Sequence, residues 1–160
     1  MKPGILLAGM SKLLQQELAT SEQLKQLLAA ERTAITERDI PAFEEILEKK
    51  RSVLEQFAHY EQERMLLLES HGIEHGPGSM DDCIKMYPAD SMLAGLWQQL
   101  LVTAAECREQ NRQNHLLVEL CSAHTRKALC VLRGEAMEQN VYGPDGDTSD
   151  PHRNRSLGIV

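Results

Sequence analysis

Apolar residues recur at helical spacing over residues 6–37, and this pattern predicts one long amphipathic helix. The apolar stripe consists of Leu7, Met10, Leu14, Leu18, Leu24, Leu28 and Ile35. Ser21 and Glu31 weaken it, because each occupies a place where the stripe would otherwise pass. Residues 38–41 form the first helix breaker. Asp39 is the expected N-cap of the next helix, since the proline that follows is tolerated in a first helical turn.

The second predicted helix covers residues 40–69 and carries the most regular pattern in the chain. Its seam positions alternate steps of three and four residues, which is the heptad repeat of a coiled coil. They are Phe43, Ile46, Lys50, Val53, Phe57, Tyr60, Arg64 and Leu67. Because Lys50 and Arg64 lie on this seam, we expect their aliphatic stems to pack while the charged heads reach water or a facing glutamate.

Residues 71–79 form the main loop, since three glycines and a proline oppose regular structure there. Ser79, with Asp82 three residues later, resembles a helix N-cap followed by an acidic residue. This pattern predicts a short helix over residues 80–86, which Pro88 ends.

A third long helix is predicted over about residues 90–138, interrupted at most mildly near Gly134. Its seam runs through Leu93, Leu96, Leu100, Ala104, Cys107, Asn111, Asn114, Val118, Cys121, Thr125, Ala128 and Leu132. Residues 106–114 are strongly polar, whereas residues 116–121 are apolar nearly all round. One buried face needs a stripe of only about 100°. The surplus apolar surface indicates a second partner surface, which binds a helix of another protein. The alternative is that both apolar faces serve the bundle or a homodimer.

These elements predict an all-α fold, an elongated antiparallel three-helix coiled-coil bundle with a short extra helix in the 71–90 loop. Helices of roughly 30, 30 and 45 residues correspond to lengths of about 45–70 Å. Residues 142–160 have turn and linker composition and are expected to form a flexible C-terminal tail. The predicted domain division is therefore a helical bundle over 1–141 and a tail over 142–160.

Composition agrees with this interpretation and excludes several classes of protein. Hydrophobic residues make up 42% of the 160 residues but aromatic residues only 4%. A β-sandwich, which is rich in aromatic and β-branched residues, is therefore nearly excluded. The net charge of −7 argues against a nucleic-acid partner, because phosphate neutralisation needs a basic surface.

The sequence also predicts a cytoplasmic protein that does not insert into membranes. The short apolar run at the N-terminus breaks at Ser11 and continues as an amphipathic helix, unlike a signal peptide. No stretch approaches the roughly 20 apolar residues needed to span a bilayer. The four cysteines have no Cys-x-x-Cys spacing, and we interpret them as reduced thiols.

Candidate catalytic and metal-binding groups are sparse. His71 and His75 could join Asp81, Asp82 or Cys83 around a metal, but the pair brackets flexible loop residues and is better interpreted as solvated. No glutamate is followed three residues later by histidine, as a di-iron bundle requires. Neither a nucleophile elbow nor a phosphate-binding loop occurs. We therefore predict no enzyme activity, no cofactor and no metal.

Three segments resemble the FlgN-type flagellar export chaperones. The first is the 43–64 helix, with its repeated leucines, lysines and glutamates. The second is the paired-asparagine segment 111–117 together with the closing segment 127–132, and the third is the Tyr-Gly-x-Asp-Gly turn at 142–146. Pro144 departs from the small residue that is usual in this turn.

The resemblance implies a cytoplasmic chaperone that binds the C-terminal helices of flagellar hook-associated proteins, which form the filament–hook junction. It implies delivery of these proteins to the type III export gate, with the export ATPase complex as a further partner. The expected cargo-binding residues are Leu116, Leu117, Leu120, Val131 and Val141. The expected docking residues for the export apparatus are Tyr142, Gly143, Asp145 and Gly146. We expect a monomer or weak homodimer, and the alternative function is a coiled-coil scaffold or tether that dimerises through its spare apolar stripe.

Overall fold

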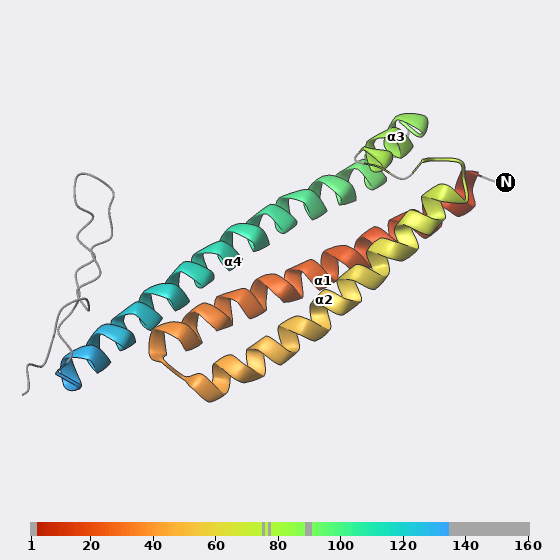
Figure 1. Cartoon of the computed structure of the whole chain (residues 1–160). Coiled ribbons are helices and arrows are strands. Elements are labelled where there is room, and N and C mark those ends of the chain that lie inside the picture. Colours follow the sequence, from red (N-terminus) through yellow and green to blue (C-terminus); the bar gives the residue numbers. More distant parts are fainter. Residues whose placement is uncertain (1–2, 75, 77, 89–90, 135–160) are drawn as a thin grey trace, which may run out of the picture. The chain divides into compact units, whose positions relative to one another are not determined.

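A computed structural model describes residues 3–74, 76, 78–88 and 91–134. Within these ranges the chain forms four helices and no strand, which confirms the predicted all-α bundle (Figure 1). The helices are α1 (Pro3–Glu37), α2 (Ile40–Glu69), α3 (Ser79–Met86) and α4 (Ser91–Leu132). No helix in these ranges is long and apolar enough to cross a membrane.

The internal contacts divide the chain into two units, residues 1–122 and residues 123–160. The first unit holds α1, α2, α3 and α4 as far as Ser122. In the second unit only residues 123–134 are described, and they continue α4 to its end. The predicted division between bundle and tail, at 141/142, lies outside the described residues.

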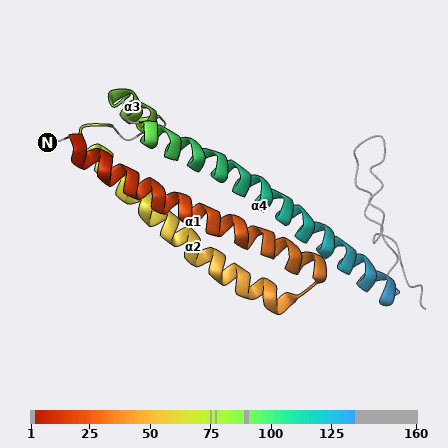
Figure 2. The ribbon, with the colours of Figure 1, turned by 180° about the vertical axis from the view of Figure 1, so that it is seen from behind.

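A tight turn joins α1 to α2, and the two helices lie side by side and antiparallel (Figures 1 and 2). Arg38 takes a left-handed backbone conformation, with φ at 58°, and so ends α1. The Asp39 carboxylate accepts a hydrogen bond of 3.1 Å from the Ala42 amide, which confirms Asp39 as the N-cap of α2. Pro41 lies in the first turn of α2, where its missing amide proton costs little.

The predicted heptad seam of α2 faces the rest of the bundle. All eight of its positions are buried or half-buried, including Lys50 and Arg64. On α1 the buried face includes Ser21, 2% exposed, and Glu31, 4% exposed. The two polar residues therefore do not break the stripe; they are part of the buried face, where each has a hydrogen-bond partner.

Helix α4 runs parallel to α1 with a fixed offset. Three side-chain hydrogen bonds each join residues 81 apart, namely Lys25–Glu106, Arg32–Gln113 and Thr103–Glu22. This offset places Glu37, the last residue of α1, opposite Val118. Residues 119–122, the last of α4 in the first unit, therefore have no further turn of α1 opposite them.

The buried seam of α4 ends earlier than the sequence pattern predicts. In the first unit the seam is buried or half-buried as far as Cys121, apart from the exposed Asn111. In the second unit the seam residues Thr125, Ala128 and Leu132 are all exposed. The prediction that a packed seam continues to Leu132 is therefore wrong.

Helix α4 ends at Leu132, and residues 135–138, over which the predicted helix continues, lie outside the described residues. Gly134 takes a left-handed conformation, with φ at 68°, and its amide donates to the Val131 carbonyl oxygen at 3.1 Å. Glycine adopts this conformation without a steric penalty, so Gly134 suits the turn that follows Leu132.

The main apolar core lies at the end of the bundle where α3 packs. It consists of Leu6, Met10, Leu14, Leu68, Ile73, Met80, Cys83, Leu93 and Leu100. Helix α3 matches the predicted short helix, but Ser79 is its first residue and not its N-cap. Gly78 occupies the cap position with φ at 109°, and its carbonyl oxygen accepts from the Asp82 amide at 2.9 Å. A left-handed glycine makes this turn without a side-chain cap.

Candidate functional site

One buried ion pair joins α1 to α2 in the first unit. The Arg64 Nε donates to Glu17 Oε1 at 2.7 Å, and both side chains are almost fully buried. The Arg64 guanidinium also lies over the Trp97 ring of α4, 5.1 Å from the ring centroid, which is a cation–π contact. These three residues, one from each long helix, form what we call layer A.

Burial raises the pKa of the Glu17 carboxyl, and the neighbouring Arg64 opposes this effect by attracting the ionised form. Glu17 Oε2 and Trp97 Nε1 are buried and have no hydrogen-bond partner among the described residues. The carboxylate of layer A is therefore paired through one oxygen only.

A second buried polar cluster, layer B, lies further along the same helices. Lys50 Nζ lies 3.1 and 3.2 Å from the two Glu31 carboxylate oxygens and donates to Asn111 Oδ1 at 2.7 Å. The Asn114 amide donates to Glu31 Oε2 and to the Leu28 carbonyl oxygen, both at 2.8 Å. The prediction that Lys50 and Arg64 reach facing glutamates is thus confirmed.

The two layers repeat one another along the chain. Glu31 follows Glu17, Arg64 follows Lys50, and Asn111 follows Trp97, each after fourteen residues, which is two heptads. Each layer takes an acid from α1, a cation from α2 and a partner from α4. A shift of α1 against α2 would separate the two ion pairs, and a shift of α4 would break the contacts of the charged groups with Trp97 and Asn111. The layers therefore fix the helix register. We did not predict this repeat, although the sequence contains its signal. Glu17 and Glu31 on the α1 stripe, and Lys50 and Arg64 on the α2 seam, are each fourteen residues apart.

An apolar cleft of about 270 Å³ lies between the two layers, and we call it the inter-layer cleft. It is lined by Ser21, Leu24, Leu28, Lys50, Leu54, Phe57, Ala104, Cys107, Arg108 and Asn111. All three long helices contribute to it, and every lining residue lies in the first unit. The sequence pattern gave no indication of this cleft.

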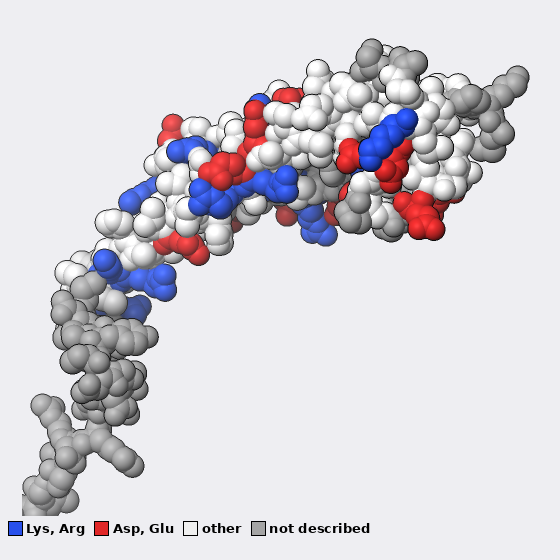
Figure 3. Space-filling model, turned by 90° about the horizontal axis from the view of Figure 1, so that it is seen from above, with Lys and Arg blue, Asp and Glu red and all other residues white. Residues whose placement is uncertain are grey.

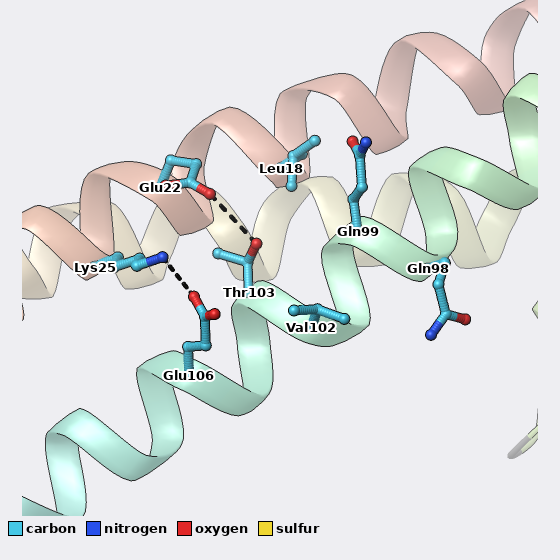
Figure 4. Close-up of a pocket in the computed structure, with 8 residues that line it drawn as sticks. All are labelled: Leu18, Glu22, Lys25, Gln98, Gln99, Val102, Thr103 and Glu106. Carbon is cyan, nitrogen blue, oxygen red and sulfur yellow. Dashed lines mark hydrogen bonds and ion pairs between the residues drawn. The ribbon is translucent and has the colours of Figure 1, made fainter.

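A second hollow, of about 360 Å³, opens between α1 and α4 (Figure 4). Two cross-helix contacts occupy its wall, Lys25 with Glu106 and Thr103 with Glu22 at 3.3 Å. In Figure 4 Gln99 points from α4 toward α1, beside Leu18, whereas Gln98 points away from α1. Lys25 is therefore paired with Glu106, and Glu22 accepts from the Thr103 hydroxyl, so these groups do not converge on a point where a reacting atom would lie.

The predicted cargo-binding leucines lie on α4, as expected from the sequence. Leu116 is 44% exposed and Leu120 is 61% exposed, while Leu117 is half-buried. In the second unit, Val131 is 71% exposed. Val141 and the four predicted docking residues, Tyr142, Gly143, Asp145 and Gly146, lie outside the described residues. Large apolar side chains are thus presented to solvent on α4 at the positions where a partner surface was predicted.

The face shown in Figure 3 has no single-sign charge pattern, because acidic and basic side chains are interspersed among uncharged ones. Elsewhere in the described residues, exposed pairs of opposite charge include Arg112 with Glu109, at 2.7 Å, and Lys49 with Glu45, at 2.6 Å. A continuous basic stripe, the usual footprint of a nucleic-acid interface, is not seen on the face in Figure 3.

The candidate metal residues are not brought together in the part of the chain that the structure describes. No group of three or more His, Cys, Asp or Glu side chains there could hold a metal ion. His71 Nδ1 instead lies 3.0 Å from the Leu67 carbonyl oxygen, and His75 is outside the described residues. The thiols of Cys83 and Cys107 are buried, and burial raises the pKa of each. A raised pKa disfavours the thiolate, which is the reactive form.

Comparison with known proteins gives a consistent result. The sequence model of the FlgN protein family matches residues 1–150. A relative from Proteus mirabilis, described as "Flagella synthesis protein FlgN", is 31% identical over 108 residues. The aligned part covers 68% of this chain and 66% of the relative, just under two thirds of its length. No solved structure matches the chain. The match over almost the whole length confirms the resemblance carried by the helical motifs, and the chain belongs to the FlgN family.

Proposed function

We propose that this protein is a cytoplasmic chaperone of flagellar type III export. It binds the C-terminal helices of hook-associated proteins, which form the filament–hook junction, and prevents their premature self-association. It then delivers them to the export gate. Membership of the FlgN family and a relative named for flagella synthesis support this role. The proposal requires no catalytic step, cofactor or metal.

The observation that carries the proposal is the exposure of leucines on α4. Leu116 and Leu120 lie one helical turn apart and remain exposed close to the point where α1 ends. Covering a leucine side chain contributes about 1.5–3 kcal/mol before ordering costs are subtracted. With Leu117, Val131 and Val141, these residues would hold an amphipathic helix firmly but reversibly.

We assign docking on the export apparatus to Tyr142, Gly143, Asp145 and Gly146. Tyr142 directly precedes Gly143 in the sequence, and a tyrosine presents an aromatic ring with a polar tip, which suits a transient protein interface. The assignment rests on the similarity of this turn to the family's. It keeps the export contact separate from the cargo contact on α4.

The test for the cargo surface is the double variant Leu116→Glu with Leu120→Glu. Titration calorimetry with a purified C-terminal segment of a hook-associated protein should show at least a hundredfold loss of affinity, since two buried leucines contribute about 3–6 kcal/mol. The matched control is Leu47→Glu with Leu66→Glu, two leucines of α2 that are 40% and 56% exposed. An unchanged affinity of the first variant, with its helical circular dichroism intact, would show that the cargo binds elsewhere.

The test for the docking segment is deletion of residues 140–160. We expect the helical circular dichroism and the melting temperature to stay nearly unchanged, while export of hook-associated proteins from flagellated cells falls. Cargo affinity should be retained in the same variant. Collapse of the bundle on deletion would contradict a docking role that is separate from the fold.

A further inference from the structure

We propose that the inter-layer cleft is a second docking site, which receives apolar side chains of an acidic amphipathic helix from the exported partner. The inference rests on the proposed chaperone function. It adds a site on the inner side of the bundle to the leucine surface on α4. Four features carry it: the void itself, what holds it open, the charges that line it, and its separation from Leu116 and Leu120.

The void exists because small side chains occupy seam positions between the layers. Ser21 on α1 is 2% exposed and Cys107 on α4 is 5% exposed, so both point into the bundle. Ala104 lies on the same seam of α4. Protein interiors are normally close-packed, and a leucine at any of these positions would fill the space. The bundle instead leaves about 270 Å³ unfilled.

The two polar layers bracket the void and hold the helices in place on both sides of it. Layer A contributes Arg64, whose guanidinium bonds Glu17 and lies over Trp97. Layer B contributes Lys50, which bonds both Glu31 and Asn111. Closing the cleft would require α4 to move relative to α2, and this movement would break contacts of buried charged groups. The void is therefore built into the helix register.

The lining favours an apolar occupant that carries negative charge. Leu24, Leu28 and Phe57 supply the walls, and an apolar cavity of about 150 Å³ already accommodates a ring the size of benzene. The lining includes two cations and no acid, although the chain has a net charge of −7. Lys50 is held by Glu31, whereas the exposed Arg108 makes no ion pair with any described residue. Arg108 at the rim is thus available to a carboxylate of the partner.

The size of the cleft favours side chains of a helix over a small-molecule ligand. Sites for drug-sized ligands usually measure about 300–1,000 Å³ and bring several polar groups together. Here the cleft is smaller, and Leu54 at its rim is 46% exposed. Apolar side chains spaced along one face of a helix suit such an opening.

The cleft is distinct from the leucine surface of the proposed function. At about 100° per residue, Leu116 and Leu120 lie about 120–180° around α4 from Ala104 and Cys107. One helix of a partner cannot cover both faces. The two sites can therefore be inactivated separately.

The test combines a variant that fills the cleft with one that reverses the charge at its rim. Ala104→Leu should preserve or raise the melting temperature of the bundle, since it fills a void. The same variant should lower the affinity for the purified C-terminal segment of a hook-associated protein at least tenfold in calorimetry. Arg108→Glu should lower this affinity about tenfold without changing the melting temperature. Lys12→Glu is the control, because it makes the same charge change at an exposed position of α1 that does not line the cleft.

Wild-type affinity for both cleft variants, while Leu116→Glu with Leu120→Glu abolishes binding, would overturn this inference and leave the proposed function intact. Failure of the wild-type protein to bind the segment would overturn the proposed function and this inference with it. A homodimer in light scattering that Ala104→Leu dissociates would assign the cleft to a second copy of the chain, and so would also overturn the inference.

Discussion

Replacing Asn114 by alanine tests whether layer B holds α4 in register. Asn114 is 3% exposed, and its side chain donates to the Glu31 carboxylate and to the Leu28 carbonyl oxygen. A hydrogen bond to a charged group contributes about 1.5–3 kcal/mol, and one to a neutral group about 0.5–1.5 kcal/mol. Because Lys50 still neutralises Glu31 in the variant, we expect Asn114→Ala to lower the free energy of unfolding by about 2–4 kcal/mol.

Urea unfolding followed by circular dichroism at the helical band measures this loss, and thermal unfolding should show a decrease of about 8–15 °C for a domain of this size. The matched control is Asn111→Ala. Asn111 is exposed and accepts a single hydrogen bond from Lys50, so its loss should cost less than about 1 kcal/mol. A double-mutant cycle with Glu31→Gln then isolates the contribution of the Asn114–Glu31 contact.

Layer B does not hold α4 in register if Asn114→Ala lowers the free energy of unfolding no more than Asn111→Ala does. The same follows if the double-mutant cycle gives a coupling energy near zero. Either result would mean that layer B is a solvated contact whose members do not constrain α4. A changed slope of the unfolding free energy against urea concentration, with an unchanged midpoint, would instead indicate that the native or unfolded state differs in compactness. The free energies of the two variants could then not be compared directly.

Three further predictions concern individual side chains. The Glu17 pKa is raised in the folded state, so its contribution to stability is greatest below its unfolded pKa and is lost as pH rises through the folded value. Accordingly, the melting temperature of the wild type relative to Glu17→Gln should increase from pH 7 to pH 4; a decrease would show that Arg64 outweighs burial. Gly95→Ala, at an exposed site inside α4 with no neighbour near the added methyl group, should raise the free energy of unfolding by about 0.5–1 kcal/mol; a loss would indicate an unseen contact. Asp39→Ala should lower the free energy of unfolding by about 0.5–2 kcal/mol, and Asp39→Asn should retain most of the stability.

The helices themselves could be predicted from the sequence because their signals are local. The heptad steps of α2, the Asp39 cap and the breaker after α1 depend on neighbouring residues, and the structure confirms each of them. The predicted cap at Ser79 was wrong because Gly78, one residue earlier, makes the turn by its backbone conformation. A left-handed glycine and a serine cap produce similar sequence patterns, and the sequence alone does not distinguish them.

Features that depend on the offset between helices could not be predicted. The seam of α4 continues in sequence to Leu132, but its last three residues, Thr125, Ala128 and Leu132, are exposed. Within the first unit, only the offset of 81 residues shows that Glu37, the last residue of α1, lies opposite Val118. The inter-layer cleft could not be predicted either, because it too depends on the offset between helices. Ser21, Ala104 and Cys107 are each compatible with a packed seam, and a void results only when the register places them around one space.

The charged seam residues explain how the bundle can contain the inter-layer cleft and still adopt one native helix register. An entirely apolar seam tolerates sliding by one heptad, because one apolar contact replaces another. In this chain a slide of one heptad would place Glu17 and Glu31 away from their cations, which lie two heptads apart. Register is thus set by Arg64 and Lys50, while the apolar cluster beside α3 supplies much of the burial. Leu116 and Leu120 belong to neither group, so their replacement should alter partner binding far more than folding.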